Sequence, residues 1–150
     1  RVHELLARFE WPTPEALADV CPGDDPAGSL VRAALAHAAV RRALGQPSPA
    51  ARALREREFD VLLDTGDRIA GVFDRLVVDE SADGATTLLV QDFKTDQLDP
   101  AELADQARAI NRHRSQLESY RAATCALFAV PPAAVRCQLI YLRYGLVAGH

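Results

Sequence analysis

The spacing of apolar residues changes twice along this chain, and that change most constrains its fold. Up to about residue 57, alanine-rich segments carry apolar side chains at helical spacing, interrupted by prolines and glycines. Between about 58 and 93 the apolar runs become short, rich in Val, Ile, Leu and Phe, and separated by turn residues. Helical spacing returns over about 100–128, and an alternating run follows the prolines at 131 and 132. The sequence therefore predicts helices, three strands, a long helix and a further strand.

The individual elements follow from this pattern. We expect helices over about 2–9, 14–21 and 26–44, the second with Thr13 as N-cap and Pro14 at its first position. Strands are expected over 59–63, 68–78 and 86–93, joined by turns at 65–67 and 81–84 into an antiparallel meander. The helix over 100–128 then leads to a strand over 135–144. This order predicts an α/β fold, a central mixed sheet (three-stranded antiparallel meander plus a crossover strand) flanked by helices.

Composition narrows the class of protein. The 150 residues are 49% hydrophobic and 25% charged, typical of a single soluble domain, here 1–150 with a helical part of about 1–57 and a sheet-and-helix part of about 58–150. No apolar run reaches the roughly 20 residues of a membrane span, and no signal peptide opens the sequence. The net charge of -4 excludes the strongly basic surface of the simplest nucleic-acid binders. Because methionine is absent, even at position 1, we expect a piece of a longer polypeptide.

The cysteines indicate a reducing compartment. Cys21, Cys125 and Cys137 are odd in number and form no C-x-x-C pair, which argues against a disulfide framework and against a zinc or iron–sulfur site. We therefore expect reduced thiols and a cytoplasmic protein.

The informative residues are charges inside strands that should be apolar. Asp92 and Lys94 point to the same side of their strand, and Asp74 interrupts the apolar run of the preceding one. If the two strands pair through their short turn, the two carboxylates converge, and they repel unless a cation lies between them. Oxygen ligands select Mg²⁺ or Mn²⁺. Two structural alternatives stay open: Asp74 paired with Arg75 or Arg68, and Lys94 as a guard on an edge strand.

The surroundings of these charges carry a family resemblance. Glu56-x-x-Phe59, Gly71-Val72-Phe73-Asp74-Arg75-Leu76, Asp92-Phe93-Lys94-Thr95-Asp96 and Gln116-Leu117-x-x-Tyr120 follow one another after a helix that carries His3. In this order and spacing the motifs resemble the RecB-like nucleases of the PD-(D/E)xK superfamily. They are most similar to the C-terminal nuclease domain of AddA-type helicase–nucleases, which are related to UvrD and Rep. The resemblance extends from His3 to the strand that ends near Tyr144.

The resemblance implies a restriction-endonuclease-like core and a role for each matching residue. His3, Asp74, Asp92 and the backbone carbonyl of Phe93 would bind Mg²⁺ or Mn²⁺, and Lys94 would position the attacking water and stabilise charge on the phosphate. Glu56 would take part in metal or water binding, and Gln116 and Tyr120 would contact the nucleic-acid backbone or support the ligands. The implied reaction is hydrolysis of a DNA phosphodiester that leaves a 5′-phosphate and a 3′-hydroxyl.

The implied partners are DNA, supplied as a single strand by a helicase motor, the rest of the chain's own helicase polypeptide, and a second helicase–nuclease subunit, with no membrane. The implied process is double-strand break repair and recombination. Alternatives are a stand-alone or phage-type exonuclease of the same superfamily, a nuclease fold without catalysis, and an unrelated α/β binding module. Within the site, Glu58 replaces Glu56 if the strand register slips by two, His3 can be structural, and Tyr120 also fits the buried stripe of its helix.

Overall fold

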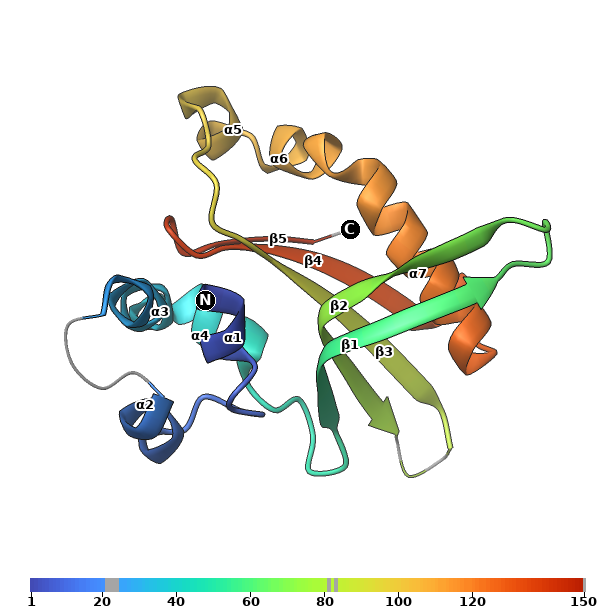
Figure 1. Ribbon diagram of the computed structural model, residues 1–150, viewed down its shortest axis with the longest axis horizontal. Helices are drawn as coiled ribbons and strands as arrows, with labels where there is room; N and C mark the ends of the chain where they lie inside the picture. The colour runs from blue at the N-terminus through green and yellow to red at the C-terminus, as the bar shows by residue number, and fades with distance from the viewer. Residues whose placement is uncertain (21–24, 81, 83, 150) are drawn as a thin grey trace.

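One five-stranded mixed sheet organises the chain. The computed structural model describes residues 1–20, 25–80, 82 and 84–149. The strands are β1 (Arg52–Leu62), β2 (Arg68–Glu80), β3 (Thr86–Lys94), β4 (Val135–Tyr141) and β5 (Leu146–Gly149), in the order β1-β2-β3-β4-β5 (Figure 1). All neighbours are antiparallel except β3 and β4, which are parallel. The predicted meander with a crossover strand is confirmed.

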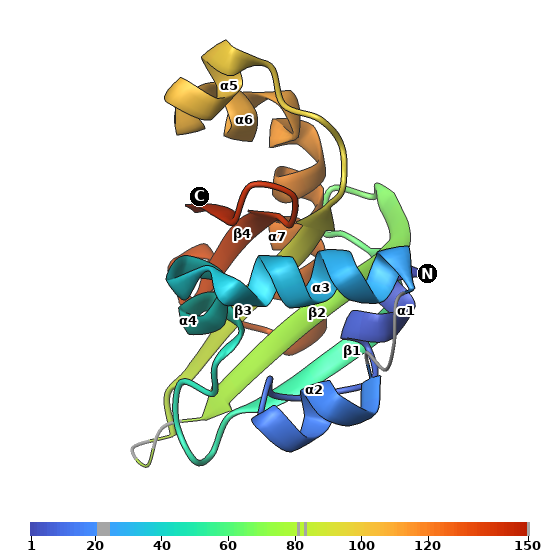
Figure 2. The ribbon, with the colours of Figure 1, turned by 90° about the vertical axis from the view of Figure 1, so that its left-hand side faces the viewer.

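Helices cover both faces of the sheet. Figure 2 shows α1 (Val2–Leu6), α2 (Pro14–Val20), α3 (Pro26–Ala36) and α4 (Ala38–Leu44) in front of the sheet, with the crossover helix α7 (Arg114–Phe128) behind it. The short helices α5 (Pro100–Ala104) and α6 (Gln106–Arg112) precede α7, and a 3-10 turn at Pro132–Ala134 precedes β4. Within the described residues, each helix is too short or too polar to span a lipid bilayer.

The helical part of the chain ends earlier than predicted. The last N-terminal helix stops at Leu44 and β1 begins at Arg52, so neither the boundary near residue 57 nor a first strand starting at Phe59 is right. The error comes from the charged stretch Arg55–Glu58, which lacks an apolar alternation because β1 is an edge strand with little buried surface. The expected end of the second helix at 21 and the turn positions 81 and 83 lie outside the described residues.

Three further elements differ from the sequence prediction. The helix over 26–44 is broken at His37, which is extended, and the helix over 100–128 is broken at Asp105 and His113. Asp105 caps α6 through its side chain, which accepts a hydrogen bond from the Ala107 N–H at 2.9 Å. The last predicted strand stops at Tyr141, and a turn with Gly145 at φ +62 leads into the unpredicted β5. A Cβ at Gly145 would overlap the ring of His37, which lies 2.1 Å from that position, so this turn requires glycine.

The inward face of the β1–β2 pair changes along its length. Leu54 and Leu76 pack into the core under α7, and farther along the pair Phe59 and Phe73 take their place. Leu54 and Leu76 have even numbers, whereas Phe59 and Phe73 have odd numbers, so the side of each strand that faces α7 changes between them. The β1–β2 register is the same before and after this change, so neither strand contains an inserted bulge residue. The change coincides with Glu56, which has φ +45. The arm formed by the distal halves of both strands therefore turns its apolar side under α7 (Figure 1).

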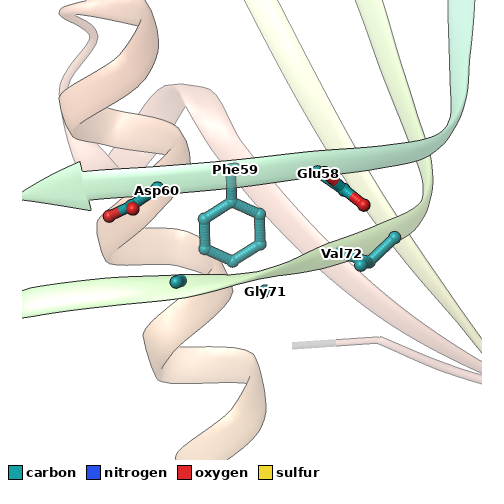
Figure 3. A pocket seen from close by; sticks show the side chains of 6 residues that line it. Glu58, Phe59, Asp60, Gly71 and Val72 are labelled. Carbon is teal, nitrogen blue, oxygen red and sulfur yellow. The ribbon is translucent and has the colours of Figure 1, made fainter.

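Gly71 leaves room for an aromatic ring from the other strand of this arm. The Phe59 ring extends across Gly71 on the neighbouring strand (Figure 3), and a Cβ there would lie 2.9 Å from the ring Cζ. Phe59 in turn stacks on Phe73 with ring centroids 4.3 Å apart, and Phe73 contacts the ring of Tyr120 at 5.5 Å. This aromatic cluster fixes the distal arm to α7.

A buried polar row holds the opposite face of the sheet. The guanidinium of Arg75, 2% exposed, donates to Gln91 Oε1 at 3.0 Å and to the Leu44 carbonyl at 3.3 Å, and lies 4.7 Å from the centre of the Trp11 ring. Gln91 Nε2 donates to the Ala43 carbonyl at 2.6 Å and to Gln138 Oε1 at 3.1 Å. These bonds join three strands to the C-terminal end of α4. Burial, and then Arg55, lower the pKa of Arg75 to about 10, so it stays charged at neutral pH.

Replacing this arginine by an apolar residue tests the row. Arg75→Met is expected to lower the free energy of unfolding by about 2–4 kcal/mol, because Gln91 Oε1 and the Leu44 carbonyl stay buried and lose their donor. Urea denaturation followed by circular dichroism measures the change. Arg68→Met, which removes an exposed guanidinium paired with Asp60, is the matched control and should leave the midpoint nearly unchanged. Equal midpoints for both variants would contradict a stabilising role for the row.

Candidate functional site

Three carboxylates lie in one row across the sheet. The β1–β2 register places Glu56 opposite Asp74, and β2–β3 pairing ends at Arg75–Gln91, one step before Asp74 would face Asp92. The strands separate there, and the Phe93 N–H donates to Asp74 Oδ2 at 2.7 Å. Asp74 and Asp92 therefore lie on neighbouring strands at the same level, as the alternation of side chains predicted, but the hydrogen bonds between the two strands end there.

Glu56 and His3 complete one side of this row. The carboxylates of Glu56 and Asp74 and the imidazole of His3 each offer one atom within 4.8 Å of the others, a spacing compatible with one metal ion. His3 comes from α1, and its Nδ1 lies 3.6 Å from Asp74 Oδ1. The positive φ of Glu56 is unusual for a residue other than glycine and costs backbone energy, as residues at functional sites often do.

Asp92 lies on the other side of the row and is almost fully buried. Its Oδ1 is 3.3 Å from the hydroxyl of Tyr120, and its Oδ2 is 2.8 Å from Nζ of Lys94. The contact with Lys94 is an ion pair without hydrogen-bond geometry, so Oδ2 has no hydrogen-bond partner among the described residues. A buried carboxylate oxygen in this state is a natural ligand atom for a cation.

Lys94 is fixed by α7. Its ammonium donates to Gln116 Oε1 at 2.9 Å, and Gln116 Nε2 donates to the Tyr120 hydroxyl at 3.1 Å. That hydroxyl also lies 3.1 Å from the Val72 carbonyl, so two acceptors, this carbonyl and Asp92, face its single proton. Lys94 is the only lysine in the chain, whose other cationic residues are 16 arginines. An ammonium concentrates its charge on one atom, whereas a guanidinium spreads it over a plane.

The electrostatics of the row favour a bound cation. Burial, followed by the charge of Asp92, raises the pKa of Asp74, although the Phe93 N–H and His3 oppose this shift. Burial and the charge of Asp92 also raise the pKa of Tyr120, so its hydroxyl stays protonated. Carboxylate oxygens with one imidazole suit Mg²⁺ or Mn²⁺. With the buried Asp92 oxygen that makes no hydrogen bond among the described residues, this donor set fits a divalent ion.

In its described part, the structure does not contain the ion pairs of Asp74 with Arg75 or Arg68, or the edge position of Lys94, that the sequence left open as alternatives. Arg75 faces the opposite side with Gln91, and Arg68 pairs with Asp60, so neither neutralises Asp74. Lys94 lies on β3, an interior strand of the sheet that pairs only with β4 at this position, and its ammonium donates to Gln116 instead of extending from a sheet edge into solvent. Glu58 lies outside the group of His3, Glu56 and Asp74 and lines an open groove on the arm (Figure 3). The position of Tyr120 is compatible with both roles, because its ring is in the core and its hydroxyl lies 3.3 Å from Asp92 Oδ1.

One supporting residue was missed from the sequence. Asp96 Oδ2 lies 3.7 Å from Arg112 Nη2 and 3.8 Å from His113 Nε2, and so ties the segment after β3 to the junction between α6 and α7. Burial, and then Lys94, lower the pKa of His113. The junction sets the start of α7 and hence the position of Gln116. The signal was the two-residue spacing of Asp92, Lys94 and Asp96, which continues one face of a strand beyond its end.

A bound ion should reverse the unfavourable effect of the carboxylates on stability. In the metal-free protein, the raised pKa of Asp74 means that the folded chain keeps a proton that the unfolded chain loses, so stability falls as pH rises above the ordinary aspartate pKa. At pH 7.5 in EDTA, Asp74→Asn should therefore unfold at or above the temperature of the native sequence. Mn²⁺ at 100 times its Kd should raise the native midpoint by about 5–10 °C and leave Asp74→Asn unchanged.

The control compares two neighbouring glutamates in the same thermal measurement. Glu56→Gln should reduce the effect of Mn²⁺, whereas Glu58→Gln should keep it in full. A midpoint that rises with Mn²⁺ in Asp74→Asn as much as in the native sequence would contradict an ion at this row.

A family model described as the PD-(D/E)XK nuclease superfamily matches residues 1–147, which is nearly the whole chain. No curated protein matches the chain significantly.

Proposed function

We propose that this chain, which belongs to the PD-(D/E)XK nuclease superfamily, is a metal-dependent deoxyribonuclease that hydrolyses phosphodiester bonds in DNA. The observation that carries the proposal is the acidic row. Glu56, Asp74 and the buried carboxylate of Asp92 lie in one row where β2 and β3 separate, and Lys94 forms an ion pair with Asp92. Membership of the superfamily itself implies a nuclease; the DNA substrate and the metal dependence are what we propose.

Each residue has a role that its position supports. His3, Asp74, Asp92 and the Phe93 carbonyl would hold Mg²⁺ or Mn²⁺, with Glu56 adjacent to the ion or to a water molecule. When bound, the ion would lower the pKa of a coordinated water and neutralise the charge of the phosphate. The ammonium of Lys94 would orient the attacking water and stabilise the negative charge that develops on the phosphate.

Gln116 and Tyr120 act on this arrangement from α7. The Gln116 amide accepts from Lys94 and donates to Tyr120, so it holds the ammonium in one place beside Asp92. The Tyr120 hydroxyl borders Asp92 Oδ1 and limits the movement of that carboxylate. Preorganised groups of this kind need little reorganisation during the reaction.

We further propose that the chain is the nuclease domain of a bacterial AddA-type helicase–nuclease. In this role it would act in the cytoplasm in double-strand break repair and recombination. A motor in the same polypeptide would supply the single strand, and a second subunit would complete the assembly. The order and spacing of the motifs from His3 to Tyr120 support this assignment. The alternatives are a stand-alone exonuclease of the superfamily and a nuclease fold without catalysis.

Cleavage of labelled single-stranded DNA tests the function. The chain should cut DNA in Mg²⁺ or Mn²⁺ and not in EDTA. Asp92→Asn and Lys94→Met should each reduce the rate by about 100-fold or more, because each removes a group that acts on the reacting phosphate or its ion. Asp60→Asn, which removes an exposed carboxylate on the arm, should leave the rate unchanged.

Two results would contradict the proposal in different ways. Cleavage that survives both Asp92→Asn and Lys94→Met would place the chemistry elsewhere. Binding of Mn²⁺ without cleavage of any DNA substrate, alone or with the full-length parent chain, would favour the fold without catalysis.

The hydroxyl of Tyr120 separates a site role from a packing role. Tyr120→Phe keeps the ring in the aromatic cluster and removes only the group beside Asp92, so its cost in stability should be about 1 kcal/mol. The cleavage rate should fall about tenfold, because Gln116 and Asp92 lose a shared partner. Rate and urea midpoint are measured on one preparation. An unchanged rate would assign Tyr120 to the core alone.

A further inference from the structure

A second concave site lies on the sheet face that carries the N-terminal helices, next to the end of α4. It is a pocket of about 410 Å³ between that helix end, the loop that follows, and strands β2, β3 and β4. Val77 and Leu89 line it, and the register places both in one row with Arg136. The pocket has the size of a small-molecule site, with apolar side chains on one side.

Positive charge borders this apolar surface. Arg42 from α4 and Arg136 from β4 line the pocket, and no acidic residue among those described does. Neither guanidinium has an ion pair or a side-chain hydrogen bond within the described part of the chain, although the protein carries a net charge of -4. Gln138 adds an amide whose oxygen already accepts from Gln91, which leaves its NH₂ group as a donor.

A third arginine lies behind the pocket wall. Arg75 is buried next to Gln91 and is hydrogen-bonded to neutral groups, the Gln91 amide and the Leu44 carbonyl. No carboxylate is hydrogen-bonded to it among the described residues, and the part of its charge that Glu10 does not offset adds to the attraction of this region for an anion.

The pocket is separate from the acidic row. Val77 and Leu89 are three residues from Asp74 and Asp92 along their strands, a displacement of about 10 Å. Asp92 faces α7 through Tyr120, whereas Arg42 reaches the pocket from α4, on the other face of the sheet. A ligand in the pocket would therefore touch none of the residues that we assign to the ion.

We propose that this pocket binds the phosphate monoester of a nucleotide. Two guanidinium groups without counter-ions match the several oxygens of a terminal phosphate, and the apolar residues offer a surface for the sugar and base. The volume accommodates one nucleotide and not a duplex. The source is either a free nucleoside monophosphate or the 5′-phosphate end of a strand. Such groups are products of the proposed reaction, but binding here depends on neither the ion nor cleavage.

Calorimetry in EDTA tests the pocket without the ion. The chain is titrated with inorganic phosphate, thymidine 5′-monophosphate, and a short single-stranded oligonucleotide with and without a 5′-phosphate. Arg42→Gln and Arg136→Gln should each raise Kd by about tenfold or more, and Arg68→Gln, which removes the same charge at the arm, should not. Because Trp11, the only tryptophan, packs in one cluster with Val77 and Leu89, its fluorescence reports phosphate binding independently.

The outcomes distinguish the sources and the alternatives. Tighter binding of thymidine 5′-monophosphate than of the 5′-phosphorylated oligonucleotide supports a free nucleotide, and tighter binding of the phosphorylated oligonucleotide supports a strand end. Affinity unchanged by Arg42→Gln and Arg136→Gln, equal binding of both oligonucleotides without binding of thymidine 5′-monophosphate, or no binding of any phosphate would overturn the proposal. A chain that binds phosphate here and cleaves no DNA would refute the proposed function alone.

Discussion

The repulsion among the carboxylates at the point where β2 and β3 separate is the constraint on which the rest of the structure depends. Asp74 and Asp92 would face each other directly if the strands continued to pair, and Glu56 extends the same row. Directly next to them in sequence, Arg75 and Gln91 form the polar row that joins these strands to β4 and α4. The polar row that joins these strands therefore lies one residue away from the place where β2–β3 pairing ends and the carboxylates meet.

Two cores meet at this opening, and each supplies part of the site. On one face, Leu5 and Leu6 of α1 belong to the same apolar cluster as Phe93, so the packing that buries them also delivers His3 to Asp74. On the other face, the cluster under α7 contains Tyr120, whose hydroxyl reaches Asp92. Neither cluster alone assembles the site, and this explains why its residues come from positions as distant as 3 and 120.

The sequence was most informative where chemistry and periodicity agreed. Asp74, Asp92 and Lys94 stood out because charges interrupted apolar strands, and the turn between the strands was enough to bring the two aspartates together. The mixed sheet followed from the change of period. Other features depend on contacts between residues far apart in the sequence. The helix over 26–44 is interrupted at His37, whose ring packs beside Gly145, and β5 follows the turn at that glycine. The beginning of β1 was missed because an edge strand is free to be polar on most of its length.

Position 94 carries the one lysine among the 17 lysine and arginine residues of the chain, and the choice of lysine explains the geometry around Asp92. A planar guanidinium at position 94 would make two parallel bonds to the Asp92 carboxylate and neutralise both oxygens. The ammonium instead lies near one oxygen, outside hydrogen-bond geometry, and directs its bond to Gln116. The buried Asp92 Oδ2 therefore has an ion pair with Lys94 but no hydrogen bond among the described residues, which leaves it able to bind a cation. Gln116 thus determines how strongly Lys94 and Asp92 neutralise each other, and the α6–α7 junction at His113, by placing Gln116, sets that balance from outside the acidic row.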